Sequence, residues 1–91
     1  MQVQHDIERQ RFEACLPGGT AFLAYATAGD KVLEMYSTFV PGKERGKGVA
    51  AALVEAALAH ARAEGYRVIP SCWYVALWIR RHPQYADLVA A

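Results

Sequence analysis

The chain has 91 residues, of which 54% are hydrophobic and 21% charged, and its formal net charge is +1. This length predicts one domain, spanning residues 1–91, that buries roughly 60–68% of the surface of the unfolded chain and so has a real core. The composition excludes a disordered chain, an overall nucleic-acid-binding charge and an acidic tail, so any recognition of an anion must be local.

The two cysteines, Cys15 and Cys72, stand far apart, with no C-x-x-C pair and no Cys/His spacing of a metal site. This pattern disfavours a zinc site and a secreted fold held by disulfides, and it fits a reducing cytoplasm. The N-terminus lacks the apolar segment of a signal peptide, and no run approaches the roughly 20 apolar residues of a membrane span. We therefore expect a cytoplasmic protein without a metal ion and without nucleic acid or a membrane as partner.

The first 40 residues predict three antiparallel strands. Residues 5–16 alternate imperfectly between polar and apolar and indicate the first strand, which ends at the turn Pro17-Gly18-Gly19. Residues 20–27 indicate a second strand, residues 28–30 (AGD) a tight hairpin connection, and residues 31–40 the third strand. The hydrophobic density of these strands suggests that helices cover one face.

Residues 48–64 predict an amphipathic helix. Its apolar side chains recur at i, i+3, i+4, i+7, i+8 and i+11 and form one stripe: Ala50, Leu53, Val54, Ala57, Leu58 and Ala61. Gly65 follows at the position of a left-handed cap.

After this helix, residues 66–72 predict a short strand. Pro70 removes a backbone donor, so the strand cannot stay paired on both sides at that point. Residues 73–81 have the apolar content of a final helix, which ends at His82-Pro83, and residues 84–91 form a short tail.

The segment between the third strand and the long helix, residues 40–50 (VPGKERGKGVA), is predicted to hold an anion. The first amides of a helix have no intrahelical partner, and the helix dipole places about half a positive charge there. Arg45 and Lys47 add full charges.

Two common phosphate-binding patterns fit this segment poorly. A Walker A loop needs four residues between its glycines, but only three separate Gly42 from Gly46, and Gly48 stands where the metal-binding hydroxyl belongs. Gly46, Gly48 and Ala51 match the dinucleotide fingerprint G-x-G-x-x-G/A, but residues 41–45 separate it from the strand. The chain is also too short for a doubly wound sheet.

The segment instead resembles the acetyl-CoA motif of the GNAT acetyltransferase superfamily, R/Q-x-x-G-x-G/A, with Lys43 at its first position. The chain is most similar to small single-domain members, through four segments in register: Val40-Pro41, RGKGVA at 45–50, Pro70-Ser71-Cys72 and RHPQY at 81–85. The resemblance covers about residues 30–89. It implies an α+β fold, the minimal acyl-CoA N-acyltransferase fold, which the elements above follow in the order β-β-β-α-β-α with a mostly antiparallel sheet.

The resemblance also implies acetyl-CoA, or CoA, as the bound cofactor. In this family pantetheine lies where the strand before the motif and the strand carrying Pro70 splay apart, and pyrophosphate lies on the loop amides. The residues expected to bind it are Phe39, Val40, Lys43, Arg45, Gly46, Lys47, Gly48, Val49, Ala50, Ser71, Cys72, Arg80 and Arg81.

The catalytic residues are less well defined. Cys72 stands where the splayed strand ends, so it is a candidate to protonate the departing thiolate, to carry the acetyl group, or merely to line the site. The family commonly has a histidine four residues before the motif proline, but this chain has Ser37. That change leaves Glu34, Tyr36 and His82 as weaker candidates for a base.

Two functions follow from this reading. One is an N-acetyltransferase that moves acetyl from acetyl-CoA to an amine, a small molecule or a protein lysine, by direct transfer in a ternary complex. The other is a CoA-binding or interaction module on the same fold, with weak chemistry because Ser37 replaces the histidine. The sequence does not select the amine, and a monomer or a weak homodimer is expected.

Overall fold

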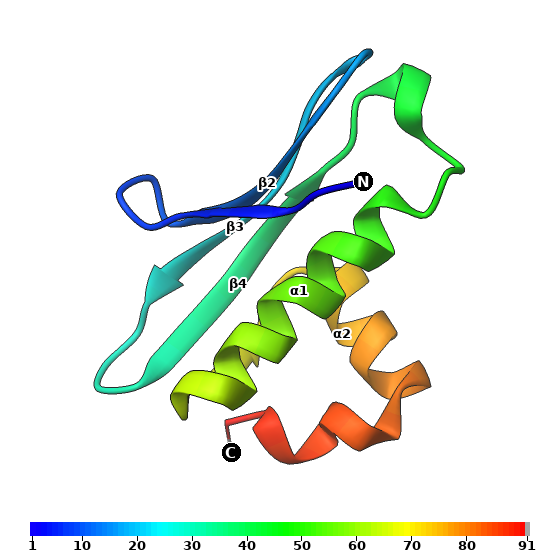
Figure 1. Ribbon diagram of the computed structural model, residues 1–91. Coiled ribbons are helices and arrows are strands. Elements are labelled where there is room, and N and C mark those ends of the chain that lie inside the picture. Colours follow the sequence, from blue (N-terminus) through cyan, green and yellow to red (C-terminus); the bar gives the residue numbers. More distant parts are fainter. Residues whose placement is uncertain (91) are drawn as a thin grey trace.

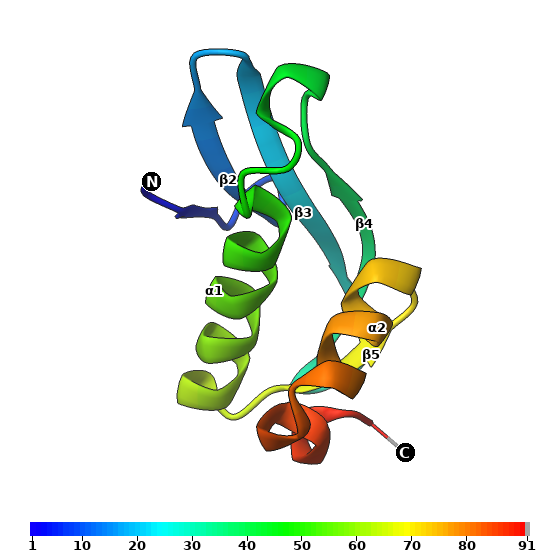
Figure 2. The same ribbon diagram turned by 90° about the vertical axis from the view of Figure 1, so that its right-hand side faces the viewer.

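The computed structural model describes residues 1–90, which form one sheet with two α-helices on the same face (Figures 1 and 2). The strands lie side by side in chain order: β1 (Gln4–Asp6), β2 (Arg11–Leu16), β3 (Gly19–Thr27), β4 (Val32–Phe39) and β5 (Arg67–Pro70). Neighbours are antiparallel except for β4 and β5, which are parallel. The predicted α+β class with a mostly antiparallel sheet is confirmed.

The prediction of a single first strand over residues 5–16 is wrong. A turn at residues 7–10 divides it into β1 and β2, which pair with each other. Gln10 has a φ of 55°, and its amide donates to the carbonyl oxygen of Ile7. The imperfect alternation arose because the chain reverses direction inside the segment, so the element order gains one strand.

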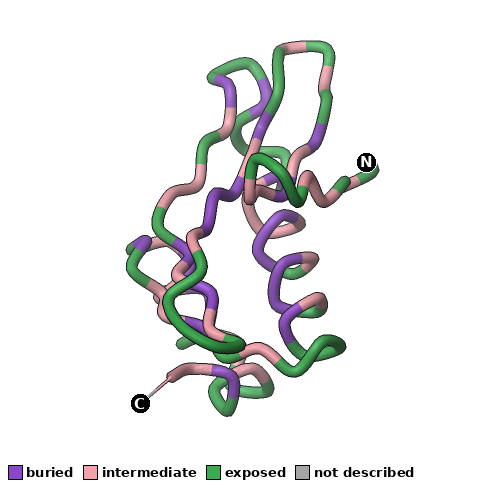
Figure 3. The backbone as a smooth tube through the Cα atoms, turned by 90° about the vertical axis from the view of Figure 1, so that its left-hand side faces the viewer, coloured by how far each residue is buried: buried purple, intermediate pink, exposed green. Residues whose placement is uncertain are grey.

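Two helices follow the strands much as predicted. Helix α1 (Val49–Glu64) buries the expected stripe from Leu53 to Ala61 against the sheet, and Figure 3 shows its buried side facing the strands. The first member of the stripe was predicted wrongly, because Val49 is buried while Ala50 is only partly buried. Gly65 ends it in the left-handed conformation, with φ of 76°. Helix α2 (Trp73–Arg81) buries Val75, Trp78 and Ile79. Within residues 1–90, no helix is long and apolar enough to span a bilayer.

The C-terminal segment is more ordered than the predicted tail. Residues Pro83–Leu88 form a 3-10 helix, η2, and the chain then returns to β5. There Val89 forms a bridge with Val68, and the Ala90 amide donates to the Val68 carbonyl oxygen at 2.8 Å. Arg62 of α1 donates to both carboxylate oxygens of Asp87, at 3.2 and 2.9 Å. These contacts hold the segment against the outer edge of β5.

A β-bulge in β4 changes which side chains face the helices. Met35 pairs with Tyr25 of β3, but Ser37 pairs with Ala24, so Tyr36 is an extra residue. Partners across an antiparallel pair lie on the same face of the sheet. Thr38, opposite the fully buried Leu23, therefore lies on the helix-covered face with Met35.

The other face of the sheet carries no helix in Figures 1 and 2. Phe22 and Phe39 contact each other there, with ring centroids 5.6 Å apart, and the Arg11 guanidinium lies 4.5 Å from the centroid of the Phe22 ring. Phe39 remains 44% exposed. The single core thus lies between the sheet and the two helices.

His5 of β1 is enclosed by aromatic rings on the helix side of the sheet. Its Nε2 and the Tyr25 hydroxyl are hydrogen-bonded at 2.6 Å, and its ring stacks on Phe12 with centroids 4.1 Å apart. The His60 ring lies 4.5 Å away. Burial and the nearby His60 lower the pKa of His5, against a smaller opposing effect of Asp6.

We expect the folded protein to lose stability as the pH falls from about 7 to about 5. A histidine with a lowered pKa binds its proton more readily in the unfolded chain, so its contribution is complete above the ordinary value of about 6.5 and is lost below it. The hydrogen bond from Arg62 also lowers the pKa of Asp87, which acts in the same direction at lower pH. Urea midpoints measured between pH 5 and 8 test this.

The variant His5→Phe provides the control. It keeps an aromatic ring against Phe12 but removes the titrating group, so the midpoint should depend less steeply on pH, whatever its absolute value. An unchanged slope would show that other groups cause the acid sensitivity.

Candidate functional site

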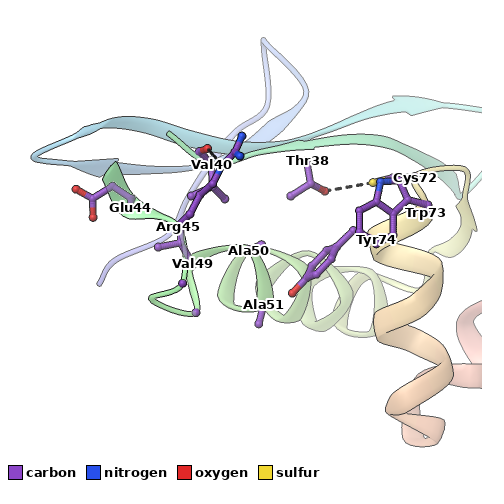
Figure 4. A pocket seen from close by; sticks show the side chains of 12 residues that line it. Thr38, Val40, Glu44, Arg45, Val49, Ala50, Ala51, Cys72, Trp73 and Tyr74 are labelled. Carbon is purple, nitrogen blue, oxygen red and sulfur yellow. Dashed lines mark hydrogen bonds between the residues drawn. The ribbon is translucent and has the colours of Figure 1, made fainter. Parts of the chain in front are cut away.

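A cavity of about 530 Å³ lies between the end of β4, the start of α1 and the start of α2 (Figure 4). Three segments line it: Thr38 in β4 with Val40 just after that strand, residues 44–46 and 48–51 around the start of α1, and residues 72–74 at the start of α2. The lining residues are Thr38, Val40, Glu44, Arg45, Gly46, Gly48, Val49, Ala50, Ala51, Cys72, Trp73 and Tyr74.

The cavity begins where β4 and β5 separate. Their parallel pairing ends with Met35 opposite Pro70, while β4 continues to Phe39. The Cys72 amide makes a last hydrogen bond to the Met35 carbonyl oxygen at 2.9 Å, and the chain then turns into α2. The predicted loss of pairing at Pro70 is therefore present, and it leaves the end of β4 without a strand on that side.

The loop end of the cavity exposes backbone donors. Gly46 and Gly48 have φ of 79° and 78°, a conformation that glycine adopts without steric cost. Gly48 is the N-cap of α1, and the amides of the first turn have no partner within the helix. The amide of Arg45, which was expected among the donors, instead bonds the Gly42 carbonyl oxygen at 3.3 Å in the short 3-10 helix η1 (Gly42–Glu44).

Among the three cations predicted to bind cofactor here, the structure brings only Arg45 to the cavity wall. Its Nε donates to the Val40 carbonyl oxygen at 3.2 Å. Lys43 and Lys47 are exposed and do not line the cavity, and the Lys47 ammonium lies 3.4 Å from a carboxylate oxygen of Glu44.

The opposite end of the cavity carries the thiol. Cys72 is buried, with 9% of its surface exposed, and its Sγ lies 3.6 Å from the Thr38 hydroxyl, as Figure 4 shows. Tyr74 extends from α2 toward α1 near Ala51. Trp73, at the rim, is 73% exposed. A thiol and two hydroxyl groups thus line the apolar end of the cavity.

Four other predicted residues lie outside the cavity lining, although they are close to it in sequence. The Ser71 hydroxyl donates to a Glu34 carboxylate oxygen at 2.6 Å, across β4 and β5. Glu34 pairs with Ala26 on the uncovered face, and Phe39 lies on the same face. Tyr36 is the bulged residue and is 52% exposed. Glu34, Tyr36 and Phe39 therefore sit across the sheet from the cavity.

The predicted residues at the end of α2 are farther away. Arg81 follows Trp73 by eight positions, which is about 12 Å along a helix, and neither it nor Arg80 lines the cavity. His82 stacks on Trp78 with ring centroids 3.7 Å apart, and its Nδ1 donates to the Trp78 carbonyl oxygen at 2.8 Å. These contacts give His82 a structural role in ending the helix.

Sequence reasoning missed five residues of the lining: Thr38, Glu44, Ala51, Trp73 and Tyr74. Thr38 reaches the cavity only because of the bulge, which no local pattern indicated. Glu44 stood inside the motif but was assigned no role, and Ala51, Trp73 and Tyr74 belonged to segments that were predicted only to be helical. The described residues include no group of three or more His, Cys, Asp or Glu side chains placed to hold a metal ion.

Comparison with known proteins identifies the family. Residues 11–88 match the sequence model of the GCN5-related N-acetyltransferases. The chain belongs to the GCN5-related N-acetyltransferase family. It is 33% identical over 91 residues to protein NATD1 of Gallus gallus, in an alignment that covers 96% of this chain and 83% of that protein. It is 32% identical to NATD1 of Homo sapiens, over 96% of this chain and 80% of that protein. The resemblance of the motif segments to this family is therefore confirmed.

A solved structure shows the same fold for this acetyltransferase-family chain. The solution NMR structure of a GCN5-like protein from Staphylococcus aureus superimposes with a TM-score of 0.77, over 99% of this chain and 88% of that one. Sequence identity is only 20%, so this likeness supports the fold and not the activity.

Proposed function

We propose that this protein is an acetyl-CoA-dependent N-acetyltransferase that transfers acetyl to an amine by direct transfer in a ternary complex. One observation carries the proposal: a single cavity joins the free amides at the start of α1 to the thiol of Cys72, where β4 and β5 separate. The family relationship supplies the class of reaction, and the cavity supplies a place for its donor.

The residues that line the cavity match the chemical groups of CoA. The amides after Gly48 and the Arg45 guanidinium would hold pyrophosphate, because both present positive charge to an anion. The apolar wall and the unpaired end of β4 would hold the pantetheine arm.

When bound, acetyl-CoA supplies the acetyl group as an activated thioester. The chain must then hold the amine nearby, accept its proton and supply a proton to the departing sulfur. Cys72 and Tyr74 are the candidate proton donors at the cavity, because a thiol and a phenol are more acidic than the Thr38 hydroxyl, and Cys72 is also a candidate nucleophile. Glu34, held by Ser71, is the candidate base on the opposite side of the sheet.

The second candidate function is a CoA-binding module with weak chemistry. Ser37 pairs with Ala24 on the uncovered face. The family resemblance implies a histidine at this position, and serine cannot act as the base that an imidazole would provide. Calorimetric titration with CoA, together with thiol release from acetyl-CoA across a panel of amines, distinguishes the two. Binding with amine-dependent thiol release supports the enzyme, binding without release supports the module, and no binding contradicts both.

The role of Cys72 has its own test. In a direct transfer, Cys72→Ala should lower kcat without abolishing it, and the intact mass of the wild-type protein should show no acetyl adduct after single-turnover exposure to acetyl-CoA. General acid contributions are typically about 10²–10⁴-fold, so the loss in kcat shows whether the thiol takes part. Tyr74→Phe is the matched comparison for the hydroxyl. An adduct that disappears in Cys72→Ala would instead establish a covalent route.

A further inference from the structure

Glu44 is the one buried charged residue in the part of the chain that the structure describes, with 6% of its surface exposed. Burying a carboxylate costs free energy unless it is paired and hydrogen-bonded. Glu44 also lines the cavity in which we place an anionic ligand, where its negative charge opposes binding. Its presence there needs a compensating role.

The contacts of Glu44 join two turns that are far apart in sequence. One carboxylate oxygen accepts the Gly18 amide at 2.9 Å, and the other lies 3.4 Å from the Lys47 ammonium. Gly18 belongs to the turn between β2 and β3, 26 residues before Glu44. Figures 1 and 2 both show this turn and η1 together at the same end of the sheet.

The two turns also pack closely. A Cβ added to Gly18 would lie 2.7 Å from the Glu44 carboxylate and 3.0 Å from the Cβ of Lys43. A Cβ added to Gly19 would lie 3.2 Å from the Pro41 ring. The hairpin turn therefore supports the start of the loop, and glycine at position 18 leaves the space that the carboxylate occupies.

We propose that Glu44 is a positioning residue that braces residues 45–48 for ligand binding through its bond to the Gly18 amide. A loop with two glycines at positive φ is flexible, and ordering it on binding would cost affinity. Fixing η1 to the hairpin turn orders the loop beforehand, with the helix amides open to the cavity. The identity of the ligand rests on the proposed function, but the bracing does not.

The variants Glu44→Ala, Glu44→Gln and Gly18→Ala separate bracing from charge. Alanine at 44 removes the acceptor, and alanine at 18 displaces it by contact. Glutamine keeps an oxygen for the Gly18 amide, releases Lys47 and removes a negative charge from the cavity. Glu13→Gln is the control, because Glu13 forms a partly buried ion pair with Arg11, at 2.7 Å, without lining this cavity.

Two measurements are made on each variant: hydrogen exchange of the amides of residues 45–48 without ligand, and calorimetric Kd values for CoA and inorganic pyrophosphate. We expect Glu44→Ala and Gly18→Ala to exchange faster and to bind CoA about tenfold more weakly, which corresponds to about 1.4 kcal/mol. Glu44→Gln should bind at least as tightly as the wild type, and Glu13→Gln should match it in both measurements.

Wild-type exchange rates in Glu44→Ala would overturn the bracing role, as would a Glu44→Gln variant that binds as weakly as Glu44→Ala. A wild-type protein that binds neither CoA nor pyrophosphate would refute the proposed function instead. In that case the exchange rates alone still decide whether Glu44 orders the loop.

Discussion

Replacing Gly48 with alanine is expected to weaken CoA binding about 10- to 100-fold. Gly48 has φ of 78° and caps α1, so a side chain there strains the backbone that carries the donor amides. A Cβ at this position meets no protein atom within 4 Å, so no clash within the fold is expected. The loss of affinity would come from the strained backbone and from a methyl group that projects into the space the ligand would occupy. One misplaced hydrogen bond to a charged group costs about 1.5–3 kcal/mol.

Gly65→Ala is the matched control at the other end of the same helix. Gly65 has φ of 76° and its Cβ position is equally open, but it lies outside the cavity. Both variants should lose similar stability, about 1–2 kcal/mol, as judged by urea unfolding. Only Gly48→Ala should change the calorimetric Kd for CoA. Equal Kd values in the two variants would show that the loop does not hold the ligand.

Leu53→Ala is expected to cause the largest loss of stability, about 2–5 kcal/mol. Leu53 is fully buried on α1 between the sheet and α2, so truncation leaves a cavity that its neighbours cannot fill without moving. A chain of this length has a total stability of about 5–14 kcal/mol. The loss therefore removes a large share of the total stability and lowers the urea midpoint by about 1 M or more.

Ile7→Ala provides the comparison, because it removes a similar apolar side chain that is 71% exposed in the turn after β1. Its urea midpoint should stay near that of the wild type. A comparable loss in both variants would mean that the apolar surface of the turn is buried in solution, for instance against a second molecule.

Features set by neighbouring residues were predictable from the sequence. The limits of α2 at 73–81, the left-handed Gly65 and the hairpin between β3 and β4 each depend on a few adjacent side chains. The turn that divides β1 from β2 was not predicted, because it contains no glycine or proline and uses Gln10 at positive φ. The turn propensities of its residues alone therefore do not predict a turn there.

The candidate site was predictable in composition but only partly in geometry. The spacing of Gly46 and Gly48 located the loop, and Pro70 indicated where β5 leaves β4. The bulge at Tyr36 arises from the pairing of β4 with β3. The sequence of β4 alone therefore did not show that Thr38, and not Ser37 or Phe39, faces the cavity. The Glu44 contact with Gly18 spans 26 residues and depends on the assembled fold in the same way.

The return of residues 88–90 to β5 bears on how copies of the chain can associate. Strands at the edge of a sheet have unpaired backbone N–H and C=O groups, which act as a template for pairing with strands of other molecules. At Val68 that template is already used by the chain's own Ala90 amide, and the opposite edge, β1, offers three residues. Growth of the sheet at the β5 edge would have to displace a segment that Arg62 also holds in place, so concentrated solutions should resist aggregation through this edge.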